Sequence, residues 1–397
     1  MERTAVEKGE SSGDLAVAQG LRVLGFCDWY TPEASGGAER ATWEVYRRLG
    51  SAGSRVYVIS ASHGRPHADP GVDVEAVRGL DLSRILGAYA APAPGAFPAG
   101  RRALSLHRPH VLHASTIHYT GCVAAAWLSQ RSGVPLVVTA QLGTLDHLPR
   151  RARLPGNLWE RTAGRYILRR AARVLAVSEA VRDHVIDLGA RPERVTIAPN
   201  GVDHARFGIR SLDPGDEPTV MAVGRLTENK GPDLLIEAAG RLAAEGPRFD
   251  VVFVGDGPMR APLETRAREL GLGRVRFTGQ VSAVEEWLRK AEIVVRSSYS
   301  EGLPLAVLEA MAAGRCNVVS DIPPNRELIE DGVSGLVFRC GDAADLARAL
   351  RRVIVDPEER ARLAGAAQRA SAAYTWDRMA ALHASAFAEV AGAASDS

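Results

Sequence analysis

Residues 291–320 read AEIVVRSSYSEGLPLAVLEAMAAGRCNVVS, and this stretch decides the fold. The run Ile293–Val295 is continuously apolar and β-branched, which predicts a parallel strand covered on both faces, and Asn317–Ser320 predicts the next strand. Between them, Leu303–Ala313 has the composition of a helix. A strand, a helix and a second strand in this order are typical of an open, doubly wound sheet.

The same alternation runs along the chain in two series, with a turn-rich pause at Pro199–Asp203 that fits an interdomain hinge. The strands expected in the first series are Leu21–Phe26, Arg55–Ile59, Val111–Ala114, Leu136–Thr139, Val174–Val177 and Val195–Ala198. Those of the second are Val220–Val223, Val251–Val254, Val275–Phe277, Ile293–Val295, Asn317–Ser320 and Leu336–Phe338. We therefore predict an α/β fold of two Rossmann-like domains that face a central cleft.

The predicted boundaries are a flexible N-terminus (1–20), an N-terminal domain (21–203), a C-terminal domain (204–375) and a final helix with a frayed tail (376–397). Two local predictions accompany them. The segment Ala88–Gly100 holds three prolines and is expected to be a loop. Ser282 and Glu285 have the spacing of a capping box, which predicts a helix start.

Composition narrows the class of protein. The chain has 397 residues, 46% of them hydrophobic, and a net charge of +2, which excludes a disordered chain and disfavours one that coats nucleic acid. Its four cysteines (Cys27, Cys122, Cys316 and Cys340) form no CxxC pair, and the first 20 residues lack a secretory signal. The uncharged run Pro109–Gln130 contains several polar side chains, so we expect strand, loop and helix there instead of a membrane-spanning helix. The isolated cysteines fit a reducing compartment, so we expect a cytoplasmic protein.

Two carboxylates flank the loop and helix of the opening stretch. A loop that turns directly into a helix offers backbone N–H groups and a positive dipole end, which suit phosphate. Carboxylates beside such a phosphate-binding site would repel phosphate and should form hydrogen bonds with neutral hydroxyl groups. We therefore expect Glu309 to hold a ribose diol and Glu301 to contact the hydroxyls of a sugar. The donor-binding residues predicted around this loop are Glu301, Gly302, Leu303, Pro304, Leu305 and Glu309.

A second loop carries two cations. In GRLTENKG, Arg225 and Lys230 follow the predicted strand Val220–Val223. A diphosphate gathers negative charge as its bond to a sugar breaks, and two fixed cations would stabilise that charge. A pair of ordinary surface cations is the competing interpretation. The chain contains no Asp-x-Asp pair for a metal-bound diphosphate, so these cations become more necessary and no metal or other cofactor is expected.

The N-terminal half supplies weaker signals. Gly36 and Gly37 let the backbone approach a ligand at the start of the predicted helix Ala38–Leu49. There is no GxGxxG fingerprint for NAD and no GxxxxGK[ST] P-loop. His113 and His118 lie at a predicted strand end and are candidates for contacting substrate, although a histidine is more often a hydrogen-bonded structural residue.

One segment is strongly basic. Arg150–Arg173 has eight arginines and a single acidic residue, Glu160. It is either a solvated helix face or a surface for anionic lipid headgroups or an anionic acceptor, in peripheral contact with the inner face of a membrane.

From about Leu21 to Trp376 the chain resembles the GT-B glycosyltransferases of family 4, which are retaining nucleotide-sugar transferases. The most specific motifs are VGRLTENKG, FVGDGP, RFTGQV, SEGLPLAVLEAMAAG and SDIPPNRELIEDGVSGLVF. The resemblance implies that Glu301 contacts the donor sugar, that Glu309 binds the ribose, and that Arg225 and Lys230 hold the diphosphate with Gly37 nearby. It also implies a metal-independent reaction, an acceptor domain followed by a donor domain, and a final helix that returns to the first domain.

The sequence departs from that family's pattern in three places. A His-x-His is common near His113, but here the second histidine is replaced by Ser115 or, with a shift, supplied by His118. Gln141 stands where a histidine often ends the next strand. Pro323 and Pro324 replace the common Gly-Gly after Ser320-Asp321.

The favoured function is transfer of a hexose-type sugar, with retention, from a UDP- or GDP-type sugar to a hydroxyl acceptor that is a glycan, a lipid-linked molecule or a small molecule. A nucleotide-sugar 2-epimerase of the same fold and a non-catalytic nucleotide-sugar sensor are the alternatives, and a Rossmann dehydrogenase is more distant. No nucleic-acid partner is expected.

Overall fold

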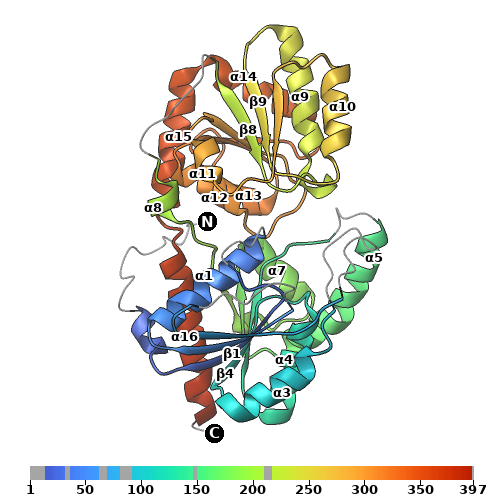
Figure 1. Ribbon diagram of the computed structural model, residues 1–397. Helices are drawn as coiled ribbons and strands as arrows, with labels where there is room; N and C mark the ends of the chain where they lie inside the picture. The colour runs from blue at the N-terminus through green and yellow to red at the C-terminus, as the bar shows by residue number, and fades with distance from the viewer. Residues whose placement is uncertain are drawn as a thin grey trace. The chain divides into compact units, whose positions relative to one another are not determined.

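The computed structural model describes residues 14–31, 36–61, 69–80, 92–145, 150–209 and 217–395. The chain divides into two compact units (Figure 1). The first unit contains Met1–Gly201 and Trp376–Ser397, and the second contains Val202–Thr375. Each unit is built on its own parallel sheet.

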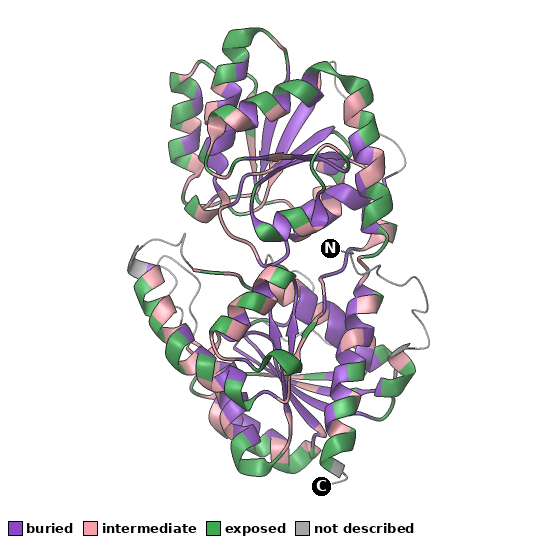
Figure 2. Ribbon diagram, turned by 180° about the vertical axis from the view of Figure 1, so that it is seen from behind, coloured by how far each residue is buried: buried purple, intermediate pink, exposed green. Residues whose placement is uncertain are grey.

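The first unit contains a parallel sheet in the order β3-β2-β1-β4-β5-β6-β7. Its central strands are buried along their length because helices cover both faces of the sheet (Figure 2). The chain runs outward from β1 in one direction through β2 and β3, and in the other from β4 to β7. The strands are β1 (Arg22–Cys27), β2 (Arg55–Ser60), β3 (Val72–Ala76), β4 (Val111–Ala114), β5 (Leu136–Ala140), β6 (Arg173–Ala176) and β7 (Val195–Ile197).

The helices of the first unit include the last helix of the chain, α16, which packs against α1 and the N-terminal turn η1. Two ion pairs, Arg48 with Asp377 and Arg173 with Glu389, tie α16 to this unit. The helical elements are η1 (Asp14–Ala18), α1 (Gly37–Ser51), α3 (Ala96–His107), α4 (Thr120–Ser132), α5 (Arg150–Trp159), the π-helical turn η2 (Glu160–Gly164), α6 (Arg165–Arg170), α7 (Glu179–Asp187), η3 (Pro192–Arg194) and α16 (Trp376–Ser395).

The second unit repeats the plan with a parallel sheet in the order β10-β9-β8-β11-β12-β13. Its strands are β8 (Thr219–Val223), β9 (Asp250–Val254), β10 (Val275–Gly279), β11 (Ile293–Arg296), β12 (Cys316–Ser320) and β13 (Leu336–Phe338). Its helical elements are α8 (His204–Phe207), η4 (Glu228–Lys230), α9 (Pro232–Glu245), α10 (Arg260–Glu269), α11 (Val284–Leu288), α12 (Leu305–Ala312), α13 (Pro323–Leu328), α14 (Ala343–Val355) and α15 (Pro357–Ser371). The core of this unit is mostly aliphatic, with Leu235, Leu242, Leu346 and Leu350 fully buried, and it also contains Phe253 and Phe338.

Strand order decides where a ligand is expected in each unit. In the second sheet β8 and β11 are neighbours, and the chain winds from them toward opposite edges. In the first sheet β1 and β4 have the same relation. At such a switch point the loops after the two strands diverge and leave a crevice at their carboxyl ends.

The predicted α/β fold of two Rossmann-like units is confirmed, and the uncharged run Pro109–Gln130 does form strand, loop and helix. Three local predictions were wrong. The loop predicted over Ala88–Gly100 gives way to α3 at Ala96, because Pro98 is tolerated in the first turn; residues 81–91 lie outside the described part. The capping box is absent, since Ala283 is the N-cap residue of α11 and Glu285 pairs with Arg206 instead.

The third concerns the N-terminus. Residues 1–13 lie outside the described part, but residues 14–18 of the expected flexible segment form η1. Ala18 is buried and its carbonyl accepts a hydrogen bond from Ser54 Oγ at 2.7 Å. Among the described residues no helix combines the length and apolar character needed to cross a membrane.

Candidate functional site

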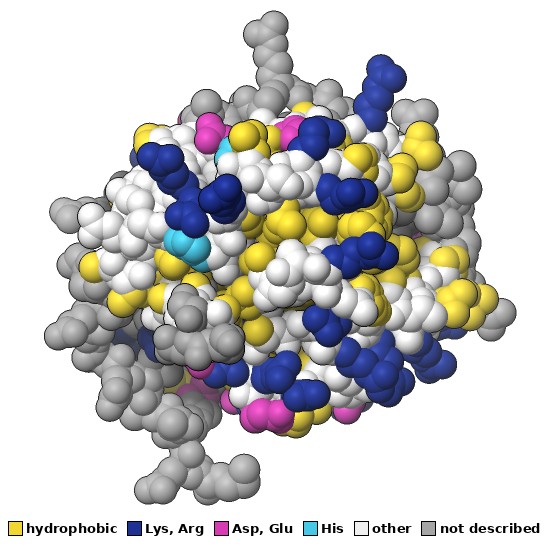
Figure 3. Space-filling model, turned by 90° about the horizontal axis from the view of Figure 1, so that it is seen from below, with side chains coloured by type: hydrophobic (Ala, Val, Ile, Leu, Met, Phe, Trp, Pro, Cys, Tyr) yellow, Lys and Arg dark blue, Asp and Glu magenta, His cyan; other side chains and the backbone are white. Residues whose placement is uncertain are grey.

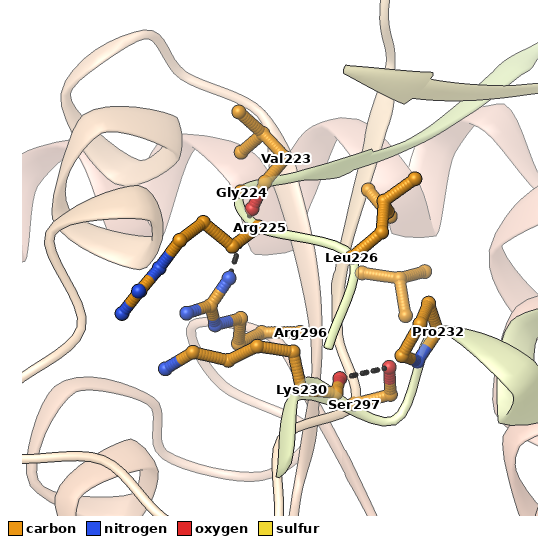
Figure 4. Close-up of a pocket in the computed structure, with 10 residues that line it drawn as sticks. Val223, Gly224, Arg225, Leu226, Lys230, Pro232, Arg296 and Ser297 are labelled. Carbon is orange, nitrogen blue, oxygen red and sulfur yellow. Dashed lines mark hydrogen bonds between the residues drawn. The ribbon is translucent and has the colours of Figure 1, made fainter. Parts of the chain in front are cut away.

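A small pocket opens at the switch point of the second unit, where β8 and β11 end. Figure 4 shows Arg225, Lys230 and Arg296 extending toward the same side of it. The lining residues come from the ends of the two strands and from the loop between β8 and α9. They are Ala222, Val223, Gly224, Arg225, Leu226, Lys230, Pro232, Val295, Arg296 and Ser297.

Two glycines let the loops around the pocket pass close to one another. Gly231 has a φ of 56°, and a Cβ there would lie 2.5 Å from the carbonyl oxygen of Ser297. Gly255, in the next loop, has a φ of 136°, and its Cβ would lie 2.1 Å from the carbonyl oxygen of Gly224. Both distances are shorter than atoms tolerate, so glycine is required at both positions. The GDGP turn thus supports the loop that carries Arg225.

Glu301 is the centre of the polar network beside the pocket. Its carboxylate accepts hydrogen bonds from Lys230 Nζ at 2.7 Å, from Arg296 Nε at 2.8 Å and from Ser298 Oγ at 2.6 Å. Arg296 Nη1 also donates to the carbonyl oxygen of Val223 at 2.8 Å. Arg225 is exposed, and its guanidinium makes no hydrogen bond or ion pair with the other described residues, so it remains available.

Burial and charge shift the pKa values of this network. Burial lowers the pKa of Lys230 to about 8, although the charge of Glu301 opposes that shift. Burial alone would raise the pKa of Glu301, but the charges of Arg296 and Lys230 overcome it and hold the value at about 2. Both groups are therefore ionised at neutral pH. Three cations and one carboxylate leave the pocket with a net charge of +2, which suits an anion.

The loop after Glu301 leads into α12, as the sequence predicted. Gly302, Leu303 and Pro304 are buried, and Pro304 is the N-cap residue of the helix with no side-chain cap. Glu309 lies one turn into α12 and is half-buried. The hydrogen bond to Glu285 raises the pKa of Arg206, and the negative charge of Glu309 adds to that shift. The structure thus brings Arg225, Lys230 and Glu301 to one site and places Glu309 on the helix that follows.

His113 is placed differently from the prediction. It is 1% exposed, and hydrogen bonds join its two ring nitrogens to Tyr46 Oη at 2.6 Å and Thr139 Oγ1 at 2.8 Å. Burial, reinforced by His383, holds its pKa well below the ordinary value. A side chain enclosed in this way is a structural histidine, and a contact between His113 and substrate does not fit the geometry.

His118 lies at the carboxyl end of β4 and keeps some exposure. Its Nε2 is 2.9 Å from Glu160 Oε1, and His184 Nε2 is 3.2 Å from the same oxygen. Burial would raise the pKa of Glu160, but the hydrogen bonds from His118 and His184 lower it to about 2. Glu160 begins the π-helical turn η2, a distortion that is frequent near functional sites.

The start of α1 is less suited to phosphate than the sequence suggested. Gly36 is the N-cap residue and Gly37 the first residue of the helix, with no side-chain cap. The carboxylate of Glu39 lies beside Gly36, 1.9 Å from where a Cβ would be, and accepts a hydrogen bond from Tyr119 Oη at 2.9 Å. A carboxylate at this helix end competes with an incoming phosphate group.

Sequence reasoning missed Arg296 and Glu160. Arg296 ends the apolar run of β11, where a charged residue is a signal of a strand entering a polar site. Glu160 is the single acidic residue within an arginine-rich segment, and its pairing with histidines depends on contacts that no local pattern shows. Among the described residues no cluster of three or more His, Cys, Asp or Glu could hold a metal ion.

Comparison with known proteins identifies the family. Residues 208–370 match the model of the glycosyl transferases group 1, and residues 35–206 match that of glycosyltransferase family 4. The D-inositol 3-phosphate glycosyltransferase of Geodermatophilus obscurus is 32% identical, over 87% of this chain and 82% of its own. The chain belongs to glycosyltransferase family 4. The α-D-kanosaminyltransferase of Streptomyces kanamyceticus, another relative, is 33% identical over 62% of this chain and 69% of its own.

A solved structure gives the same fold for this glycosyltransferase. HepE of Anabaena, in complex with UDP-glucose, superposes with a TM-score of 0.72 at 22% identity, covering 95% of this chain and 100% of HepE. Two parallel-sheet Rossmann-like domains of this kind define the GT-B fold. The pocket at β8 and β11 therefore belongs to the second Rossmann-like unit of a GT-B glycosyltransferase.

Proposed function

We propose that this glycosyltransferase transfers a hexose-type sugar, with retention and without a metal ion, from a UDP- or GDP-type sugar to a hydroxyl acceptor. The observation that carries the proposal is the pocket with a net charge of +2 at the ends of β8 and β11. Each phosphate of a nucleotide sugar carries a negative charge, so the two charges of the diphosphate balance the net charge of the pocket. Arg225 and Lys230 would hold the diphosphate, and Glu301 and Glu309 would address the sugar and the ribose.

In this mechanism the bond between the anomeric carbon and the diphosphate oxygen breaks, and its electron pair remains on the phosphate. The acceptor oxygen bonds to the same face of the anomeric carbon, and its proton passes to the departing phosphate. The developing negative charge would be stabilised by Arg225 and Lys230 at fixed positions. No described carboxylate is free of cations and placed as a nucleophile at the pocket, which supports this front-face route.

Relatives support the choice of a nucleotide-sugar donor and leave the acceptor broad. HepE has been crystallised with UDP-glucose, which makes a UDP-sugar the first donor to test. The name of one relative specifies D-inositol 3-phosphate and that of the other a kanosaminyl group, so the inference from them stops at a hydroxyl acceptor. In the first unit Gly36, Gly37 and His118 remain our proposed substrate contacts.

We further propose a cytoplasmic protein in peripheral contact with an anionic membrane through α5–α6. Leu154 and Leu158, one turn apart on α5, are 67% and 66% exposed. Arg161, Arg165 and Arg169 are exposed in the same segment. Figure 3 shows a face of the molecule on which basic side chains outnumber acidic ones. Apolar and basic side chains together favour binding to anionic lipid. This contact is tested by comparing co-sedimentation of the protein with vesicles that contain phosphatidylglycerol and with vesicles of phosphatidylcholine alone.

The function is tested with a panel of UDP-, GDP- and ADP-sugars in EDTA. A ligand present at about 100-fold its Kd raises the free energy of unfolding by about 2.7 kcal/mol, which a thermal shift detects. The selected donor is then followed by NMR with and without acceptor hydroxyl compounds. Slow hydrolysis and acceptor-dependent transfer to an α-linked product from an α-linked donor are expected. Conversion of the sugar without acceptor would favour the 2-epimerase, and binding without any turnover would favour the sensor.

A further inference from the structure

The two carboxylate oxygens of Glu301 have different partners. Oε1 accepts from Arg296 Nε at 2.8 Å and from Ser298 Oγ at 2.6 Å, and it lies 2.5 Å from Arg296 Nη2. Within the described part of the chain Oε2 has one partner, Lys230 Nζ at 2.7 Å. One oxygen is therefore held by several donors, while the other would be opened by the movement of a single side chain.

Arg296 is held in place on two sides. Its guanidinium bridges Glu301 and the carbonyl oxygen of Val223, and its side chain is only 12% exposed. A Cβ at Gly224 would lie 2.9 Å from Arg296 Nη1, so the loop leaves room for the guanidinium and for little else. The planar fork of arginine fits such a double contact, and moving it would break both contacts at once.

Lys230 has the opposite character. Its backbone carbonyl accepts a hydrogen bond from Ser297 Oγ at 3.1 Å, while its side chain has one ionic contact within the described segments, with Glu301. The chain contains three lysines among 49 basic residues, so a lysine here stands out against the prevailing arginine. An ammonium on a flexible stem can turn from one anion to another without losing a bidentate contact.

We propose that Arg296 is a positioning residue that keeps Glu301 charge-compensated, so that the donor can take both Lys230 and the Oε2 oxygen. Lys230 turns to the diphosphate, and Oε2 accepts a hydrogen bond from a sugar hydroxyl. Without Arg296, the same movement would leave a buried carboxylate with no cation beside it, which is strongly unfavourable. The inference rests on the proposed function, because it requires a nucleotide diphosphate in this pocket.

The test is a double-mutant cycle on the Kd of UDP, measured by titration calorimetry at low salt. Arg296→Gln is expected to weaken UDP binding about tenfold or more, since Lys230 becomes the sole cation of Glu301. Glu301→Gln should change the Kd by only about threefold in the wild-type background, where Arg296 already compensates the carboxylate. In the Arg296→Gln background the same substitution should restore binding about tenfold, because Lys230 no longer has an anion to leave behind.

Arg225→Gln is the matched control. It removes a pocket cation of equal charge that has no contact with Glu301. Adding Glu301→Gln to it should give the same small change as in the wild-type background. Equal effects of Glu301→Gln in the Arg225→Gln and Arg296→Gln backgrounds would overturn the inference, because Arg296 would then contribute only its charge.

Thermal unfolding checks that each variant is folded. If Arg296→Gln does not fold, Arg296→Lys replaces it in the double-mutant cycle. Lysine keeps a cation beside Oε1, so Glu301→Gln should again change the Kd of UDP only slightly in that background. A large restoration there would contradict the inference. The proposed function fails if the wild-type protein binds no nucleoside diphosphate. The inference about Arg296 alone fails if the wild type binds UDP and the effects of Arg296→Gln and Glu301→Gln on the Kd are additive.

Discussion

Replacement of Lys230 by alanine removes one cation from the pocket while leaving Glu301 compensated. Arg296 and Ser298 still hold Oε1 of Glu301, so we expect the second unit to remain folded. The loss falls on the diphosphate. A charge-assisted hydrogen bond contributes about 1.5–3 kcal/mol, which corresponds to a decrease in kcat of about 10- to 150-fold.

The decrease should appear in turnover more than in binding. The charge on the phosphate rises as the sugar–oxygen bond breaks, so Lys230 interacts more strongly with the transition state than with the bound donor. We therefore expect the KM for the donor to rise by a smaller factor than kcat falls. Steady-state kinetics with the donor selected by thermal shift, at saturating acceptor, separates the two effects.

Lys290→Ala is the control, because Lys290 is exposed on the same unit and, among the described residues, its ammonium contacts only the ring of Trp287, 5.6 Å from the ring centre. Its kinetics should match those of the wild type. A kcat and a KM of Lys230→Ala that both equal those of the wild type would refute any role of this residue in the reaction. A higher KM at unchanged kcat would refute the argument that the charge acts in the transition state.

Three further predictions follow from the pKa values, the backbone and the core. First, kcat/KM for the donor should fall as the pH rises through about 8, because Lys230 loses its proton there. In Lys230→Arg the value of kcat/KM should stay level to about pH 10, because an arginine keeps its proton over this range. A wild-type kcat/KM that does not change with pH in this range would be inconsistent with the prediction. Second, Gly231→Ala should lower the free energy of unfolding by about 1–3 kcal/mol in urea titrations, because φ is 56° and the new Cβ would clash with the carbonyl oxygen of Ser297. Gly271→Ala should lower the free energy of unfolding by less, because Gly271 has a similar φ of 67° but open space around the new Cβ. Third, His113→Ala should destabilise the protein by about 2–5 kcal/mol, because Tyr46 and Thr139 lose a buried partner, while His118→Ala should mainly lower turnover; similar unfolding curves for both variants would contradict their separate placement.

Local patterns were sufficient to predict the fold. Buried parallel strands are continuous apolar runs, and such runs need no information from elsewhere in the chain. The strand β3 was missed because its sequence, VDVEA, alternates with acidic residues at the edge of the sheet and looks polar. The start of α3 was missed because the prolines around it favour a loop, although a proline is compatible with a first helical turn.

The site was predictable where its residues follow strand ends. Arg225, Lys230 and Glu301 come from two loops, and the neighbouring positions of β8 and β11 bring those loops together. The role of a side chain beyond its position was not predictable. Whether His113 faces solvent or the core depends on Tyr46, Thr139 and α16, all distant in sequence, and the same holds for the contact of Glu160 with His118.

The most direct test is a crystal structure of the protein with the nucleoside diphosphate that stabilises it, grown in EDTA. We predict that the terminal phosphate lies within hydrogen-bond distance of Lys230 Nζ and the guanidinium of Arg225, with Arg296 still on Glu301. A diphosphate bound away from these side chains, or one that binds only when a divalent cation bridges it to the protein, would contradict the account.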